Sequence, residues 1–219
     1  MRLLLTLTAS ALALAGCSYS SHGPADNRSV ERAGMVASGD VDATGSAEYA
    51  GMIVRASGDI GRDLDLAGAS VRSDARVGGN LTAAGARVRF TGSVAGTTDV
   101  EAATAYLAGQ YDGDVSIVGA RLTVEGNVDG ALFAQGARIQ LGGRFAQPVR
   151  VVGDGNRLSG HAIVSGTLES GGTICASEVD IRRSARIHGS LTVIADERPD
   201  NLAPDATFEP LSGRRCDRL

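Results

Sequence analysis

Three histidines and three pairs of acidic residues are the side chains of this sequence that suit general acid–base or metal chemistry. The histidines are His22, His161 and His188. No two of them have the spacing of metal ligands. The acidic pairs are Asp40 and Asp42, Asp63 and Asp65, and Asp112 and Asp114. Paired carboxylates cleave glycosidic bonds in some enzymes, but aspartate is also a common turn residue. We therefore expect solvated turn residues, with no catalytic residue, metal site or cofactor.

Arginine is the only basic residue type in the chain. All 21 positions counted as Lys or Arg are Arg. The absence of lysine excludes the Walker A lysine, the acylating Ser-x-x-Lys motif and a pyridoxal Schiff base. The formal net charge is −4, with acids and arginines interspersed. This balance argues against a general nucleic-acid-binding protein.

The first 17 residues, MRLLLTLTASALALAGC, combine a positive start, an apolar stretch too short to span a bilayer and a cysteine. Their end, Leu14-Ala15-Gly16-Cys17, resembles the lipobox of bacterial lipoproteins. That resemblance implies a signal peptide at 1–16, cleavage before Cys17, and acyl chains such as palmitate on the new N-terminus. Ser18 in place of Asp implies sorting to the outer membrane. An ordinary signal peptide with a chance cysteine is the alternative.

Lipidation of Cys17 would leave two cysteines from an odd total of three, Cys175 and Cys216. Outside the cytoplasm two such thiols tend to oxidise. The sequence therefore predicts a disulfide between Cys175 and Cys216. Free thiols or intermolecular pairing are the alternative.

The body of the chain repeats itself every 17 residues. Gly-Ala-Arg occurs at 85–87, 119–121 and 136–138, and apolar positions keep the same period, as in Leu64, Leu81, Thr98, Val115, Leu132 and Val149. Within a unit the apolar residues follow the i, i+2 spacing of strands. One unit cannot bury its inner face, whereas stacked units can. We predict an all-β, single-stranded parallel β-helix with 17-residue coils over residues 38–195, its interior a ladder of Val, Leu and Ile.

The period also sets the expected boundaries. The register holds from about Ala47 to Ser165, roughly seven coils, and places His161 in an outward column with Arg144. Residues 184–193 match 74–83 at an offset of 110, which is not a multiple of 17, so we place an enlarged corner at 168–179, carrying Cys175. Residues 17–37 are interpreted as the lipidated cysteine and a polar tether. Residues 196–219 are interpreted as a cap over the last coil, with a disordered tail as the alternative.

Arg87, Arg121 and Arg138 fall at one corner of the repeat. Such a set could contact an anionic glycan or a lipopolysaccharide phosphate. The alternative is a solvated edge that discourages lateral aggregation.

The alternation in ARLTVEGNVDGALFA, residues 120–134, resembles the repeats of bactofilins, the polymer-forming bacterial cytoskeletal proteins. Leu122–Ala134, Val88–Val100 and Ile187–Val193 are the matching stretches. The resemblance implies a right-handed helix that assembles end to end without nucleotide and scaffolds cell-wall enzymes. Typical bactofilins, however, are cytoplasmic and leave both helix ends free. A second resemblance, to the head domains of secreted or lipid-anchored adhesins, depends on ASGDV at 37–41 and ASGDI at 56–60.

These features together predict a lipid-anchored structural or scaffolding protein of the cell envelope that self-assembles and is not an enzyme. A surface adhesin-like or glycan-binding module is the alternative, and an enzyme acting on polysaccharide is less favoured. The expected partners are the membrane through the lipid anchor, further copies of the chain forming a homo-oligomer or filament, and peptidoglycan or envelope proteins, but no nucleic acid. The expected location is the outer membrane facing the periplasm, or else the cell surface.

Overall fold

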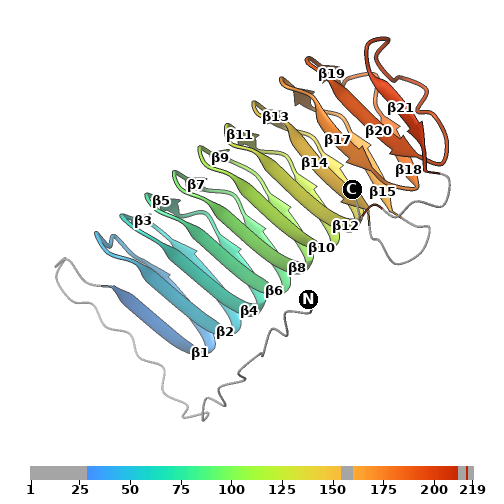
Figure 1. Cartoon of the computed structure of the whole chain (residues 1–219). Coiled ribbons are helices and arrows are strands. Elements are labelled where there is room, and N and C mark those ends of the chain that lie inside the picture. Colours follow the sequence, from blue (N-terminus) through green and yellow to red (C-terminus); the bar gives the residue numbers. More distant parts are fainter. Residues whose placement is uncertain (1–28, 154–159, 212–215, 217–219) are drawn as a thin grey trace, which may run out of the picture.

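The computed structural model describes residues 29–153, 160–211 and Cys216, and the fold there is an all-β solenoid of about 10 turns (Figure 1). Its strands form two sheets in which every pair is parallel. The larger sheet contains β1 (Val30–Asp40), β2 (Ala47–Ser57), β4 (Leu64–Ser73), β6 (Leu81–Phe90), β8 (Thr98–Leu107), β10 (Val115–Val124), β12 (Leu132–Leu141), β14 (Val149–Gly153), β15 (His161–Val164), β17 (Gly172–Cys175), β18 (Glu178–Ile181), β20 (Leu191–Ala195) and β21 (Thr207–Pro210). The smaller sheet contains β3 (Asp59–Ile60), β5 (Arg76–Val77), β7 (Ser93–Val94), β9 (Gln110–Tyr111), β11 (Asn127–Val128), β13 (Arg144–Phe145), β16 (Thr167–Leu168) and β19 (Arg186–Ile187).

A regular coil consists of one long strand and one two-residue strand, as β4 and β5 show. β4 pairs with β6 at an offset of 17, from Leu64 with Leu81 to Ser73 with Phe90. The buried positions of β4 are even-numbered before the corner at 68–70 and odd-numbered after it, because the chain turns there while the pairing continues. The 17-residue period predicted from the sequence is thus confirmed.

The corner glycines let successive coils approach closely. A Cβ atom on Gly85 would overlap the carbonyl oxygen of Gly68 in the preceding coil. Gly34 lies in the first coil, and the nearest atom to a Cβ there would be the carbonyl oxygen of Val36 at 3.8 Å. Glycine is therefore favoured in this column because of the neighbouring coil. Ala102 occupies the same column between Gly85 and Gly119, so the stack adapts to a methyl group at that coil.

The core is an aliphatic ladder interrupted by aromatic rings. Tyr49, Phe90, Tyr111 and Phe145 are the largest of the fully buried side chains among the described residues. This corrects the expectation of an interior of Val, Leu and Ile. Phe90 pairs with the small, buried Ser73 of the preceding coil, and alternation of small and large residues makes room for such a ring.

Six extra residues enter the solenoid between β14 and β15. Leu132 pairs with Val149 at an offset of 17, but Arg138 pairs with His161 at an offset of 23. Two more enter between β18 and β19, since Thr167 pairs with Arg186 at an offset of 19. Four steps of 17, one of 23 and one of 19 account for the offset of 110.

This placement corrects two expectations. The 17-residue register ends at Gly153 and not at Ser165, and Cys175 lies in the regular strand β17, opposite Val152 of β14, rather than in an enlarged corner. The physical reason is that strand alternation resumes equally well after an insertion at either place. Apolar periodicity alone therefore counts the extra residues without locating them.

The first coil begins earlier than residue 38. β1 starts at Val30 and pairs with β2 at the regular offset, from Val30 with Ala47 to Asp40 with Ser57. Residues 30–37, expected to belong to the tether, are thus part of the solenoid. Because no coil precedes β1, most of its side chains stay exposed, and its pattern of apolar residues is weak. The expected signal peptide, Cys17 and His22 lie outside the described residues.

The C-terminal segment covers the last coil. β21 pairs with β20, from Thr192 with Thr207 to Ala195 with Pro210. The side-chain amide of Asn201 donates a hydrogen bond of 2.8 Å to the carbonyl oxygen of Ile181. Leu202, Ala206 and Phe208 pack against the core. Residues 196–211 therefore form a cap. Within the described part of the chain, no helix has the length and apolar character needed to cross a membrane.

Candidate functional site

The three corner arginines expected to contact an anion lie in one column of the stack. Arg121 pairs with Arg138, whereas Thr104 separates Arg87 from Arg121. All three side chains are exposed. The column is therefore interrupted, and only two of its arginines are adjacent.

His161 continues this corner column and does not follow Arg144. It pairs with Arg138 on one side and Glu178 on the other, while Arg144 pairs with Thr167. Its Nε2 atom lies 3.9 Å from a carboxylate oxygen of Glu178. The expected outward column with Arg144 was wrong because of the six residues inserted before His161. His188 is exposed on the last coil.

The paired acids act mainly as acceptors between neighbouring turns. The carboxylate of Asp63 accepts a hydrogen bond from the backbone N–H of Asn80 at 2.8 Å, and that of Asp114 accepts one from Ala131 at 2.8 Å. Asp42 accepts one from the N–H of Asp59 at 3.3 Å. Each contact joins residues 17 apart, so these carboxylates stabilise the stacking of turns. Among the described residues, no group of three or more His, Cys, Asp or Glu side chains is placed to hold a metal ion.

A continuous arginine ladder occurs elsewhere, on the N-terminal coils. Arg55, Arg72 and Arg89 pair in register on β2, β4 and β6. All three side chains point outward and are exposed. Neighbouring strands lie about 4.8 Å apart, so the cationic groups repeat at about that spacing. The sequence analysis missed this ladder, although the 17-residue step from Arg55 to Arg72 to Arg89 contains it.

The arginine ladder lines a surface groove of about 370 Å³. The groove crosses the last residues of β1, β2, β4 and β6, where the long strands lead into the next turn. Its remaining lining is polar or small: Ser38, Gly39, Asp40, Ala56, Ser57, Asp74 and Thr91. We call these residues, together with the ladder, the arginine groove.

The far end of the ladder is held by an aromatic ring. The guanidinium carbon of Arg89 lies 4.2 Å from the centroid of the Tyr106 ring, in the next coil. The Tyr106 hydroxyl donates a hydrogen bond of 2.6 Å to the Glu125 carboxylate. This hydrogen bond raises the pKa of Tyr106, so the phenol stays neutral and its orientation is fixed. Cation–π contact therefore positions the Arg89 side chain.

Arg55 and Arg72 form no ion pair with an acid in the described part of the chain. Like charges facing each other across paired strands destabilise a sheet. Two unit charges about 4 Å apart repel by about 1 kcal/mol even in bulk water. A ladder of three therefore carries an electrostatic cost that no described neighbour offsets by pairing. Binding an anion would remove that cost.

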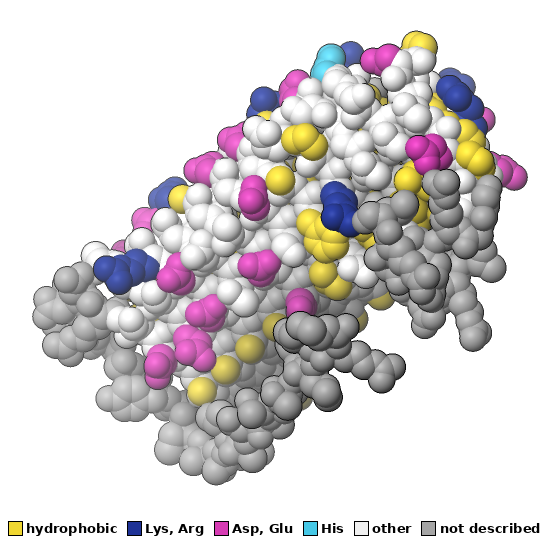
Figure 2. All heavy atoms as spheres, in the orientation of Figure 1, with side chains coloured by type: hydrophobic (Ala, Val, Ile, Leu, Met, Phe, Trp, Pro, Cys, Tyr) yellow, Lys and Arg dark blue, Asp and Glu magenta, His cyan; other side chains and the backbone are white. Residues whose placement is uncertain are grey.

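Charge is segregated around the same coils. Glu31, Glu48 and Asp65 form an acidic column on the first halves of β1, β2 and β4. Figure 2 shows acidic side chains gathered over the N-terminal half of the face that it presents. The arginine ladder is on the second halves of the long strands, so the N-terminal coils carry opposite charges on their two faces.

An apolar corner separates the two charged columns. Met35, Val36, Met52 and Ile53 lie at the corners of β1 and β2 with exposed fractions of 69, 56, 60 and 40%. The equivalent positions of the next coil, Ala69 and Ser70, are small. The large apolar side chains are thus confined to the first two coils.

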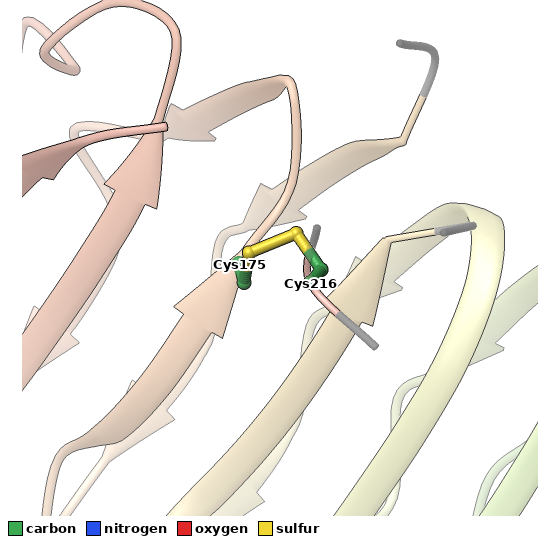
Figure 3. Close-up of a disulfide and its surroundings, with 2 residues drawn as sticks. All are labelled: Cys175 and Cys216. Carbon is green, nitrogen blue, oxygen red and sulfur yellow. A yellow bond between two sulfur atoms is a disulfide. The ribbon is translucent and has the colours of Figure 1, made fainter. Parts of the chain in front are cut away.

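The disulfide predicted between Cys175 and Cys216 is present in the structure (Figure 3). The two Cα atoms are 5.5 Å apart, and the linked residues are 41 apart in sequence. The bridge lies in a small buried cluster with Val152, Ile194 and Leu211, apart from the main core. It ties the C-terminal segment to the outer face of the larger sheet and has a structural role there.

Comparison of the chain with protein-family models, with curated proteins and with solved structures found no match.

Proposed function

We propose that this protein is a lipid-anchored structural or scaffolding rod of the bacterial cell envelope, without catalytic activity. The observation that carries the proposal is a stacked solenoid that begins at Val30, 13 residues after the cysteine of the lipobox-like motif. Thirteen residues reach at most about 45 Å. The first coils then stay near the membrane that holds the lipid, and about 10 turns project a rod of about 50 Å.

The exposed apolar corner supports this arrangement. Met35, Val36, Met52 and Ile53 lie at the end of the rod nearest the proposed anchor. Exposed apolar patches of this kind suit contact with a membrane or another protein. The bactofilin-like stretch 120–134 falls on β10, β11 and the start of β12, so that resemblance concerns the coil itself and supports a scaffolding role.

The two ends of the rod differ in their capacity for self-assembly. β1 pairs only with β2 and leaves one edge open, whereas the edge of β20 pairs with β21 of the cap. An open edge is a template for pairing with a second chain. We propose that self-association uses β1 and joins two copies, a more limited assembly than an end-to-end filament.

The test of the anchor is a comparison of Cys17→Ala with the matched variant Ser18→Ala in a bacterial host. The unmodified chain and Ser18→Ala are expected in the outer-membrane fraction, with an N-terminal peptide whose mass includes acyl chains on Cys17. Cys17→Ala is expected in the soluble fraction. An unmodified Cys17, or a wild-type chain that fractionates as a soluble protein, would overturn the anchor.

The scaffolding role is tested by crosslinking the wild-type chain in intact cells and repeating the experiment with Cys17→Ala. A scaffold is expected to crosslink reproducibly to envelope proteins, and the loss of anchoring should disperse these contacts. A chain that crosslinks to nothing in the envelope would contradict the role. The arginine groove favours a second candidate, a glycan-binding surface module, and its ligand is considered next.

A further inference from the structure

We propose that the arginine groove binds a linear acidic polysaccharide that carries carboxylate or sulfate groups along its length. This ligand class goes beyond the structural role and does not depend on the lipid anchor. Arg55, Arg72 and Arg89 come from three consecutive coils, so their guanidinium groups repeat along the rod axis at about 4.8 Å. A repeating cationic row suits a ligand with repeating anions better than a single small anion.

The arginines have donor groups free for such a ligand. Arg55 and Arg72 make no ion pair with the described acids, although Asp40 and Asp74 line the same groove. Guanidinium groups bind carboxylate and sulfate-like oxygens through two parallel N–H···O bonds. Arg89 stacks on Tyr106 at 4.2 Å, so its plane is oriented before a ligand arrives. Orientation in advance lowers the entropic cost of binding.

The opposite side of the groove offers acceptors and hydroxyls. Asp40, Ser57, Asp74 and Thr91 follow one another in a single column, since each lies next to the ladder on its own coil. Carboxylates and hydroxyls of this kind accept hydrogen bonds from sugar hydroxyls. The same carboxylates repel a ligand that consists of anions alone. The mixed lining therefore favours a chain that bears both hydroxyl and acidic groups.

The groove is less suited to nucleic acid. Single-stranded nucleic acids bind on aromatic side chains that stack with the bases. No aromatic side chain lines the groove, and Tyr106 beside it is already occupied by Arg89 and Glu125. The groove is also open along the rod surface, which lets a long chain pass through it.

The test measures binding of polyuronate oligosaccharides to the full chain, purified in mild detergent, by calorimetry at low salt. A neutral oligosaccharide of equal length and inorganic polyphosphate serve as comparison probes. We expect the polyuronate to bind more tightly than either probe, with an affinity that falls as salt is raised. The double variant Arg55→Gln/Arg72→Gln is expected to bind polyuronate at least about tenfold more weakly, because two charge-assisted contacts are lost.

The matched control is Arg183→Gln/Arg186→Gln, which removes the same charge from exposed arginines at the other end of the rod. It should leave polyuronate binding unchanged. Asp74→Asn provides a second discriminating variant, because it removes an acceptor for sugar hydroxyls and also a repulsive charge. It should weaken polyuronate binding and strengthen polyphosphate binding.

The proposal is overturned if polyuronate does not bind at low salt, or if the groove variant and the control variant lose affinity equally. It is also overturned if polyphosphate binds better than polyuronate, since that would make the groove a general polyanion site. Thermal unfolding of each variant shows whether the fold is retained. If the double arginine variant does not fold, the Asp74→Asn result decides. None of these outcomes bears on Cys17 or on membrane attachment.

Discussion

At the scale of single residues, the buried tyrosines are the least expected part of the structure. Tyr49 and Tyr111 are fully buried in a core that is otherwise aliphatic. The Tyr111 hydroxyl donates to the carbonyl oxygen of Ala108 at 3.3 Å, whereas the Tyr49 hydroxyl has no hydrogen-bond partner among the described residues. Burial raises the pKa of both phenols well above the usual value of 10.0. The neutral phenol is thus the form that the fold accommodates.

This burial predicts a loss of stability at high pH. A phenol whose pKa is higher in the folded state contributes fully below the unfolded pKa of about 10, and the contribution declines as pH rises above it. At pH 11 the free energy of unfolding should fall by about 1.4 kcal/mol for each buried tyrosine. Denaturant unfolding between pH 8 and 11 measures this decline. Tyr111→Phe should show a smaller decline than the wild-type chain, and an equal decline would contradict the assignment.

At the scale of elements, the corner of the long strand determines how closely the coils stack. Gly68 and Gly85 occupy equivalent positions of β4 and β6, and a Cβ atom on the second would overlap the carbonyl oxygen of the first. Gly34 has the same place in β1 but no coil before it. The two positions share their local sequence role and differ in their stacking.

This difference predicts opposite results for one substitution. Gly85→Ala should lower the free energy of unfolding by about 1–3 kcal/mol, the usual cost of overpacking, and nearer the lower value because Ala102 is tolerated in the same column. Gly34→Ala should change it by less than about 0.5 kcal/mol. Denaturant unfolding of the two variants measures both. Equal effects would mean that backbone flexibility, not stacking, explains the glycine.

Much of the coil could be predicted from sequence because its residues repeat at a fixed step. The strand pairing of Leu64 with Leu81, the turn at Gly68 and the Cys175–Cys216 pair all follow from local pattern or from composition. The position of the six-residue insertion could not, since alternation carries no record of where extra residues enter. The start of β1 was missed because a terminal coil has only one neighbour to bury its side chains against.

The candidate site divides in the same way. The 17-residue step from Arg55 to Arg89 is visible in the sequence, and the ladder could have been found by following each column to its end. The groove itself could not, because it depends on which columns flank each other where a long strand leaves the sheet. Asp40 and Asp74 belong to it through that geometry. The contact of Arg89 with Tyr106 likewise needs side-chain positions.

At the scale of the whole molecule, the cap makes the two ends of the rod unequal. The disulfide closes a segment of 41 residues and holds the cap against β17 and β20. Closing a loop of that size stabilises a fold by about 4 kcal/mol in the chain-entropy model, and measured values are commonly about 2–4. The bridge therefore protects both the stability of the last coils and the edge of β20.

Cys216→Ser is expected to lower the free energy of unfolding by about 2–4 kcal/mol and to expose the cap to proteases. With the cap loosened, the edge of β20 becomes available, so the variant should form larger assemblies than the wild-type chain. Denaturant unfolding, limited proteolysis and size-exclusion chromatography measure the three effects. Reducing agent should produce the same changes in the wild-type chain. Unchanged proteolysis and assembly would show that β21 holds the cap without the disulfide.

The insertion between β14 and β15 has a consequence for evolution and engineering. Val151 pairs with Ala134 before it and Ala162 pairs with Ile139 after it, so six added residues leave both halves of the coil in place. The strands, and not the length of the corner, determine how one layer sits on the next. Descendants of such a chain can therefore acquire loops at this corner while the rod keeps its length. The same corner is a natural graft point for displaying a foreign peptide on the side of the rod.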